Sequence, residues 1–78
     1  MYYAKIEIRT TDKKQVSDLA LLVFEAFSVY LEELKIKEAK PGVYALSITT
    51  NSERVYLWRL STLVERAKAN GLLDKMVI

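Results

Sequence analysis

The sequence contains neither cysteine nor histidine. The absence of cysteine excludes disulfide bonds and thiolate metal sites. The absence of histidine removes the most common general base and the most common metal ligand. Acid–base, nucleophilic and zinc-dependent catalysis are therefore disfavoured, and we expect a protein that is not an enzyme and uses no cofactor or metal ion.

The chain also has no large excess of charge of one sign and no long apolar run. Twelve Lys and Arg residues face ten Asp and Glu residues, so the formal charge of +2 is far from the basic balance of a dedicated nucleic-acid binder. The longest apolar run, Leu19 to Phe24, is too short to span a bilayer, and the first residues lack the plan of a signal peptide. We expect a cytoplasmic protein without membrane contact, while auxiliary contact with RNA stays open.

Few residues are available to build a core. The 78 residues suffice for one domain, spanning 1–78, near the size at which a single core only just outweighs the conformational entropy lost on folding. Association with another chain is therefore an expected source of extra stability.

At the beginning of the chain the apolar residues follow first the spacing of a strand and then that of a helix. Tyr2 to Thr10 places apolar residues at every second position, which predicts a half-buried strand. Thr11 or Asp12 is the expected N-cap of a long first helix. This helix is expected to run as far as Leu34, because apolar residues keep helical spacing at Val16, Leu19, Ala20, Val23, Phe27, Tyr30, Leu31 and Leu34.

A hairpin is predicted around Pro41-Gly42, because proline presets the first turn position and glycine supplies positive φ at the second. Tyr44, Leu46 and Ile48 should face inward on its second strand. The outer face of the sheet then carries mostly charged and small polar residues, namely Tyr3, Lys5, Glu7, Arg9, Lys35, Lys37, Ser47 and Thr49.

A second helix and a short tail complete the chain. Thr50 as cap and Glu53 fit a capping box for a helix from about residue 52 to residue 70, which stops at Gly71. The tail 75–78 would add a fourth strand or simply pack. The order β-α-β-β-α, with this short final strand if it forms, predicts an α+β fold: a two-layer sandwich in which an antiparallel sheet of three or four strands carries two helices on one face.

Basic residues on the outer sheet face are the candidate RNA contacts: Lys5, Arg9, Lys35 and Lys37. Readout of single-stranded RNA on such a sheet relies on aromatic platforms, and Tyr3 is the only aromatic residue there. Solvation of a charged face is therefore the favoured interpretation. A stand-alone RNA-binding or protein-interaction module that acts through this face is the alternative function.

Trp58, the only tryptophan, lies outside the apolar stripe of the second helix. At about 100° per residue, Trp58 falls roughly 160° from the direction shared by Tyr56, Leu57, Leu60, Leu63, Val64 and Ala67. Two interpretations stay open. Trp58 lies flat on its own helix or beneath the folded-back chain end, or it anchors an interface, as Trp and Arg often do.

The first helix favours the interface. Leu22, Ala26 and Val29 form a second apolar stripe, with Leu21 beyond it, turned away from the stripe that faces the sheet. Helices packed between a sheet and another helical layer would show two such sides; alternatively, Leu22 and Val29 fill the gap between the two helices of one chain. The candidate partner-binding residues are Leu22, Val29, Arg54, Val55, Trp58, Arg59 and Thr62.

Several segments resemble the small dimeric subunit of the KEOPS complex, the archaeal and eukaryotic machinery that makes threonylcarbamoyladenosine in tRNA. They are AKIEI in the first strand, VFEAF in the first helix, the hairpin, and LSITTNSERVYLWRLSTL from strand into helix. The resemblance implies a non-catalytic subunit that forms a homodimer, or a heterodimer with a paralogue, and binds a larger catalytic ATPase-like subunit through its outer helix faces. Here those faces carry Leu22, Val29, Val55 and Trp58, and tRNA is a further implied partner.

The second helix departs from this family. A Leu-Arg pair is typical there, followed four residues later by Asn, whereas this chain has Tyr56-Leu57 and Ser61. An Asp near the start of the helix is replaced by Ser52. No role of the family arginine therefore carries over, and the chain resembles a diverged member or a paralogue.

A small-molecule regulatory domain is a third candidate. Such sites need close backbone approach or convergent polar groups, and the only two glycines, Gly42 and Gly71, already serve a turn and a helix end. Carboxylate pairs such as Asp12 with Asp18 are better explained as solvated helix charge than as acid–base catalysts.

Overall fold

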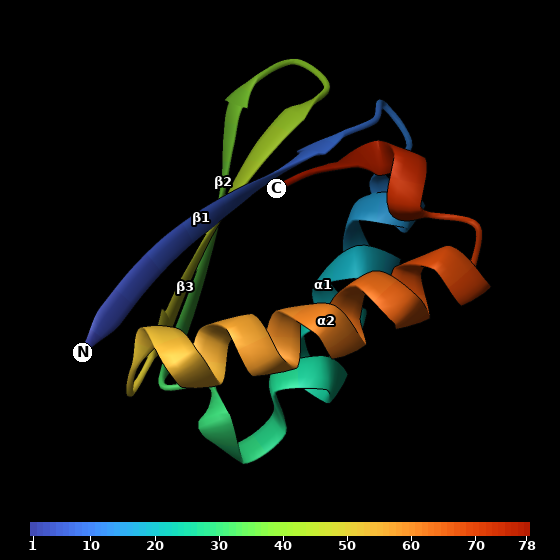
Figure 1. The fold of residues 1–78 in the computed structure, drawn as a ribbon. Coiled ribbons are helices and arrows are strands. Elements are labelled where there is room, and N and C mark those ends of the chain that lie inside the picture. Colours follow the sequence, from blue (N-terminus) through green and yellow to red (C-terminus); the bar gives the residue numbers. More distant parts are fainter.

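Four strands and two helices form two layers in the computed structural model, which describes all 78 residues. The strands pair in the order β2-β3-β1-β4, every pairing is antiparallel, and both helices cover one face of the sheet (Figure 1). The predicted α+β sandwich is confirmed, and the tail does form a fourth strand. The elements are β1 (Tyr2–Arg9), α1 (Lys13–Phe27), the 3₁₀ helix η1 (Ser28–Tyr30), β2 (Glu33–Lys40), β3 (Val43–Thr50), α2 (Glu53–Ala69), the 3₁₀ helix η2 (Leu73–Lys75) and β4 (Met76–Val77).

The core lies between the helices and the inner face of the two central strands. β1 pairs with β3 along its whole length, from Tyr2 opposite Thr50 to Arg9 opposite Val43. Because side chains alternate along a strand, the even-numbered residues of both strands face the helices. The buried apolar residues of the sheet and helices form one cluster, which includes Ile6, Ile8, Val16, Leu19, Val23, Ala26, Phe27, Leu46, Ile48, Tyr56, Leu63 and Ala67.

Tyr56 ties the start of β1 to the helical layer. Its ring centroid lies 5.4 Å from that of Tyr2 and 5.8 Å from that of Phe27. Burial, and then the nearby Tyr2 hydroxyl, raise the pKa of the Tyr56 hydroxyl above its ordinary value, so the side chain stays neutral in this apolar setting.

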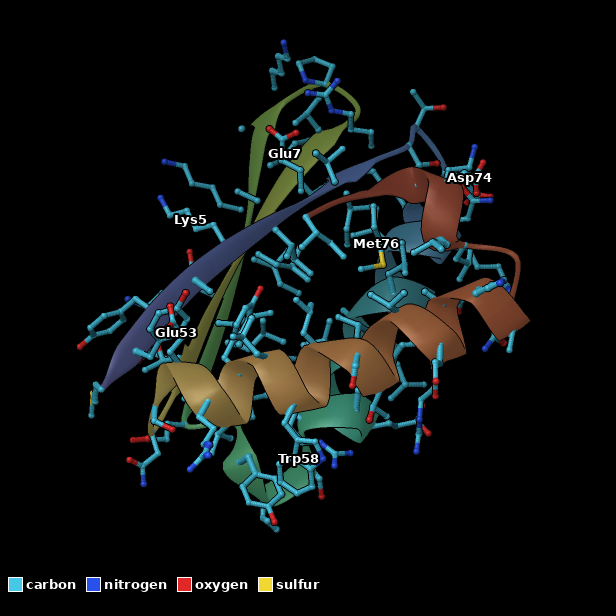
Figure 2. All side chains as sticks on the ribbon, viewed as in Figure 1. Lys5, Glu7, Glu53, Trp58, Asp74 and Met76 are labelled. Carbon is cyan, nitrogen blue, oxygen red and sulfur yellow. The ribbon has the colours of Figure 1, made fainter.

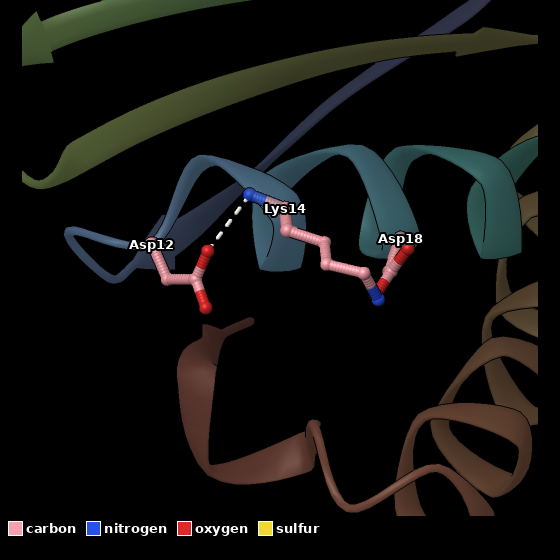
Figure 3. Close-up of polar contacts among 3 residues, drawn as sticks. All are labelled: Asp12, Lys14 and Asp18. Carbon is pink, nitrogen blue, oxygen red and sulfur yellow. Dashed lines mark hydrogen bonds and ion pairs between the residues drawn. The ribbon is translucent and has the colours of Figure 1, made fainter.

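Asp12 caps α1. Its carboxylate accepts a hydrogen bond from the backbone N–H of Lys14 at 2.9 Å, which satisfies one of the free donors in the first turn (Figure 3). One turn further, the Lys14 ammonium lies 3.3 Å from the Asp18 carboxylate. Of the two predicted caps, Asp12 is the one used, and both carboxylates serve the helix itself.

The first helix is shorter than predicted. α1 ends at Phe27, and Ser28 leaves helical geometry with φ 49° and ψ −131°. Tyr30 lies on η1, and Leu34 lies on β2 opposite Ile48. The predicted extension to Leu34 is wrong. Apolar residues beyond Phe27 keep helical spacing by coincidence, but from Glu33 the chain pairs with β3 as strand β2, and this pairing decides the structure.

Ser28 is expected to be a strained position. Its φ and ψ fall in a region that only glycine occupies freely. We expect Ser28→Gly to raise the free energy of unfolding by about 1 kcal/mol, because the relief of backbone strain exceeds the added entropy of the unfolded chain. Urea denaturation measures the change. Ser17→Gly, in the middle of α1, is the control and should lower the free energy of unfolding by about 0.5 kcal/mol; a loss of stability in both variants would contradict the assignment of strain.

Gly42 and Ser52 set the two ends of β3. Gly42 has φ 80°, as expected for the hairpin turn, and its carbonyl oxygen accepts a hydrogen bond from the backbone N–H of Thr10 at 2.9 Å. Ser52 caps α2, since its hydroxyl oxygen accepts from the backbone N–H of Val55 at 3.3 Å. The prediction of Thr50 as the cap is wrong, because Thr50 still belongs to β3 and its hydroxyl donates to the Ser52 carbonyl oxygen at 2.9 Å.

The end of α2 turns the chain back toward the sheet. The backbone N–H of Leu72 donates to the Ala67 carbonyl oxygen at 2.8 Å and that of Gly71 to Lys68 at 3.1 Å, the two bonds of a Schellman motif. Gly71, with φ 69°, ends the helix as predicted. The chain then reaches β4, which pairs with β1 only at Glu7 and Ile8. The rest of this edge of β1 has no neighbouring strand.

Candidate protein interaction surfaces

Trp58, Tyr30 and Arg59 form a surface cluster, called the Trp58 cluster below. The Tyr30 and Trp58 rings meet edge to face with their centroids 5.1 Å apart. The Arg59 guanidinium lies 4.6 Å from the centre of the Trp58 ring and 5.8 Å from that of Tyr30. The cluster joins α2 to η1 on the side of the helical layer that faces away from the sheet (Figure 2).

Trp58 remains 51% exposed within this cluster. The chain end does not fold over it, since the last residues lie beside β1 (Figure 1). Tyr30 and Arg59 cover it in part, and a large aromatic surface stays open beside an arginine, the combination typical of binding hot spots. Tyr30 was not predicted as part of this surface, because the helical spacing placed it in the buried stripe of a first helix that is in fact shorter.

The other predicted partner-binding residues do not share one open surface. Val29 is 86% exposed next to Tyr30, and Arg54 is exposed one turn before Trp58. Val55, Thr62 and Leu22 are only half-exposed, and Leu22 packs against the core.

The second apolar stripe of α1 is only partly open. Ala26, predicted to face away from the core, is fully buried, whereas Leu21 is 59% exposed. Ala26 is covered because this side of α1 packs against α2. The alternative interpretation, in which the stripe fills the gap between two helices of one chain, therefore holds for Leu22 but not for Val29, which lies beyond the end of α1.

A second surface is the open half of β1, residues 2–5. The hydrogen bond from Thr10 N–H to the Gly42 carbonyl continues the β1–β3 register. Hydrogen-bonded and non-hydrogen-bonded pairs alternate in an antiparallel ladder. The backbone N–H and C=O groups of the even-numbered residues of β1 therefore bond to β3, and those of the odd-numbered residues point toward the opposite edge of β1. On that side Glu7 meets β4, but the N–H and C=O groups of Tyr3 and Lys5 have no strand beside them.

The start of α2 lies near the open half of β1, since Tyr56 packs against Tyr2. Arg59 and Arg66 contact residues of α1, which places Leu57, Leu60 and Val64 on the opposite flank. In Figure 1, α2 lies in front of α1 and β1 lies in front of β3. Leu57, predicted to be buried with the core stripe, is 55% exposed, because β4 is too short to extend the sheet beneath it.

The outer sheet face presents its predicted basic residues to solvent: Lys5, Arg9, Lys35 and Lys37. Figure 2 shows Lys5 pointing away from the helices. Arg9 lies 3.0 Å from the Glu7 carboxylate and Lys35 lies 3.5 Å from that of Glu33. Part of the positive charge is therefore matched within the face itself.

Thr49 was predicted to face outward with these residues, but its neighbours on the face shield it from solvent. Thr49 is buried, because it lies between Glu33 on β2 and Tyr3 on β1 in one row of the sheet. Tyr3 is 71% exposed and is the only aromatic side chain on the face. This arrangement has no pair of aromatic rings on which successive bases could stack.

The largest hollow, about 460 Å³, is an open groove beside α1 and the end of α2. Asp12 and Asp18 on its wall already serve α1, and Glu25 lies 3.9 Å from Arg66. No group of three or more side chains is arranged to hold a metal ion. Neither helix has the length and apolarity of a membrane span. The groove is therefore open, but its acidic side chains already have partners within the chain and do not form a ligand site.

No protein-family model matches the chain, and no curated protein matches it either.

Proposed function

We propose that the chain is a non-catalytic subunit that forms a dimer and docks onto the larger catalytic subunit of the threonylcarbamoyladenosine (KEOPS) machinery for tRNA modification. The observation that carries the proposal is that α2 shows apolar side chains on two sides besides its buried stripe. Leu57 is 55% exposed on one side and Trp58 is 51% exposed on the other. Exposed apolar patches mark interaction sites, and two separate sides call for two partners.

The first partner is a second copy, or a paralogue of the same fold, along the open half of β1. Two antiparallel β1 strands related by a two-fold axis at Tyr3 place the two Tyr3 residues opposite each other and Lys5 of each copy opposite Met1 of the other. The pairing then stops before Ile6, beside which the end of the same chain lies. Tyr3 and Lys5 have free backbone groups on this edge of β1, so each facing pair exchanges backbone hydrogen bonds. Between these pairs, the small Ala4 of each copy lies opposite Tyr2 of the other.

The same axis brings the two α2 flanks together. Leu57 of each copy then lies over the joined strands and loses contact with water, which favours association by the hydrophobic effect. The pairing also removes a sheet edge that would otherwise be free to pair with unrelated chains.

The second partner is the catalytic subunit, which packs on the Trp58 cluster. The mechanism of the subunit is positional: it holds the catalytic subunit and brings no reacting group of its own. The family that the chain resembles uses the outer faces of the same two helices, and the element order agrees with that family. The apolar contact is supplied by Trp58 together with the exposed Val29.

Light scattering and co-purification test the proposal. The isolated protein should have twice the mass of the 9.0 kDa chain. Coexpressed with the catalytic ATPase-like subunit, it should elute as one complex with it. A monomer that fails to bind this subunit would contradict the proposal in both parts.

A further inference from the structure

Arg59 is held in one orientation by three contacts within the chain. Its Nε donates to the Ala26 carbonyl oxygen at 2.6 Å, a carbonyl of the last turn of α1. Its guanidinium stacks near the Trp58 and Tyr30 rings, with the ring centres 4.6 Å and 5.8 Å away. A guanidinium fixed in this way loses little conformational entropy when it binds a further group.

Most donors of this guanidinium are unused. Arginine carries five N–H donors, and Nε is the only nitrogen of Arg59 with a hydrogen-bond acceptor. Arg59 takes part in none of the ion pairs of the protein. The two terminal nitrogens are thus free to bind an anion side by side, the geometry that a carboxylate fits.

The surroundings of Arg59 are apolar and positive. Val29, Tyr30 and Trp58 are exposed beside it, and the nearest further charge along α2 on this side is Arg54. Glu25, the acidic neighbour of Ala26 on α1, lies 3.9 Å from Arg66 and forms no ion pair with Arg59. Charge complementarity therefore calls for a partner that brings a negative charge next to apolar side chains.

We propose that the Trp58 cluster binds a carboxylate, Asp or Glu, carried by an apolar helical segment of the docking partner, with Arg59 as the residue that recognises it. The inference rests on the proposed docking function and adds the chemistry of the partner segment. The carboxylate receives two parallel hydrogen bonds from the terminal nitrogens of Arg59, while the apolar side chains of the segment cover Trp58 and Val29.

A protein carboxylate fits the cluster better than a nucleic acid. Base stacking needs an aromatic face free on a flat platform. One face of Trp58 is occupied by Arg59, and Tyr30 meets Trp58 at an interplanar angle of 64°, so the two rings do not offer parallel platforms. The exposed Val29 adds apolar surface that a phosphate backbone would not use.

Trp58 reports on the test directly, because it is the only tryptophan of the chain. Three synthetic helical peptides without aromatic residues share one leucine stripe and carry Glu, Gln or Lys beside it. Titration of each peptide is followed by Trp58 fluorescence. We expect the Glu peptide to bind at least about tenfold more tightly than the Gln peptide, since one charge-assisted hydrogen-bond pair is worth that factor, and the Lys peptide to bind most weakly.

Two variants separate Arg59 from the general positive charge. Arg59→Lys keeps the charge but lacks the planar fork, so the preference for Glu over Gln should fall severalfold. Arg54→Lys is the matched control and should keep the preference. The comparison of the three peptides on the unaltered protein needs no variant, so it stands even if Arg59→Lys disturbs packing.

Each other outcome overturns the inference. Equal binding of the Glu and Gln peptides, no binding of any peptide, or an Arg59→Lys variant with full preference would exclude carboxylate recognition by Arg59. Tighter binding of a short oligouridine than of the Glu peptide would assign the site to phosphate instead. None of these outcomes bears on whether the catalytic subunit binds, which co-purification decides separately.

Discussion

Replacing Lys5 with proline is expected to convert the dimer into a folded monomer. The Lys5 N–H points to the free edge of β1, so proline removes no hydrogen bond to β3. In the proposed dimer the same change removes one donor from each copy and places a ring against the partner strand. We expect the dissociation constant of the dimer to rise at least about thirtyfold, from the loss of two hydrogen bonds of about 1 kcal/mol each. Analytical ultracentrifugation measures it.

Ala4→Pro is the matched control, one residue away. The Ala4 N–H belongs to the bonds between β1 and β3, so this change removes a ladder bond and should destabilise the fold itself by about 1–3 kcal/mol. Circular dichroism melting curves should thus separate the two variants, with Lys5→Pro near the unaltered protein and Ala4→Pro far below it. A dimer that survives Lys5→Pro with its affinity unchanged would place the interface elsewhere.

Trp58→Ala is expected to weaken binding of the catalytic subunit by about 2–3 kcal/mol, or roughly 30- to 150-fold in affinity. The loss comes from the large aromatic surface that the partner covers, and from Arg59, which loses the ring against which it stacks. Calorimetric titration of the catalytic subunit with each variant gives the change. The dimer should persist, because Leu57 and the open half of β1 lie on the other side of α2.

Phe24→Ala provides the comparison for Trp58. Phe24 is 54% exposed on α1, close to the 51% of Trp58, but it takes part in none of the ring-stacking or cation–π contacts of the Trp58 cluster. Its removal should leave affinity for the catalytic subunit unchanged. Equal losses for Phe24→Ala and Trp58→Ala would mean that exposed apolar surface alone drives binding, without a defined anchor.

The sequence allowed most of the fold to be predicted, because its signals are local. Alternation in β1, the Pro41-Gly42 turn and the glycine after α2 each act within a few residues. The end of α1 was predicted wrongly for the same reason. No glycine or proline marks it; Ser28 takes an uncommon backbone conformation there, and the pairing of β2 with β3, which depends on distant residues, fixes where the helix must stop.

The surfaces were harder to predict than the fold. Trp58 stood out from the helical spacing alone, but its neighbour Tyr30 reaches it only because α1 ends early. Leu57 fits the core stripe of α2 by its angle, and its exposure follows from the two-residue length of β4. The end of α1 and the length of β4 both depend on residues far along the chain from Trp58 and Leu57, so the spacing of apolar residues in α2 does not reveal them.

The brevity of β4 also bears on how the protein should be handled. Val77 lies opposite Glu7, and the antiparallel register directs whatever follows Ile78 along the vacant backbone of Lys5 and Tyr3. An affinity tag fused at that end could dock there as an extra strand and mask self-association. Cleaving such a tag before any measurement of mass would remove this artefact.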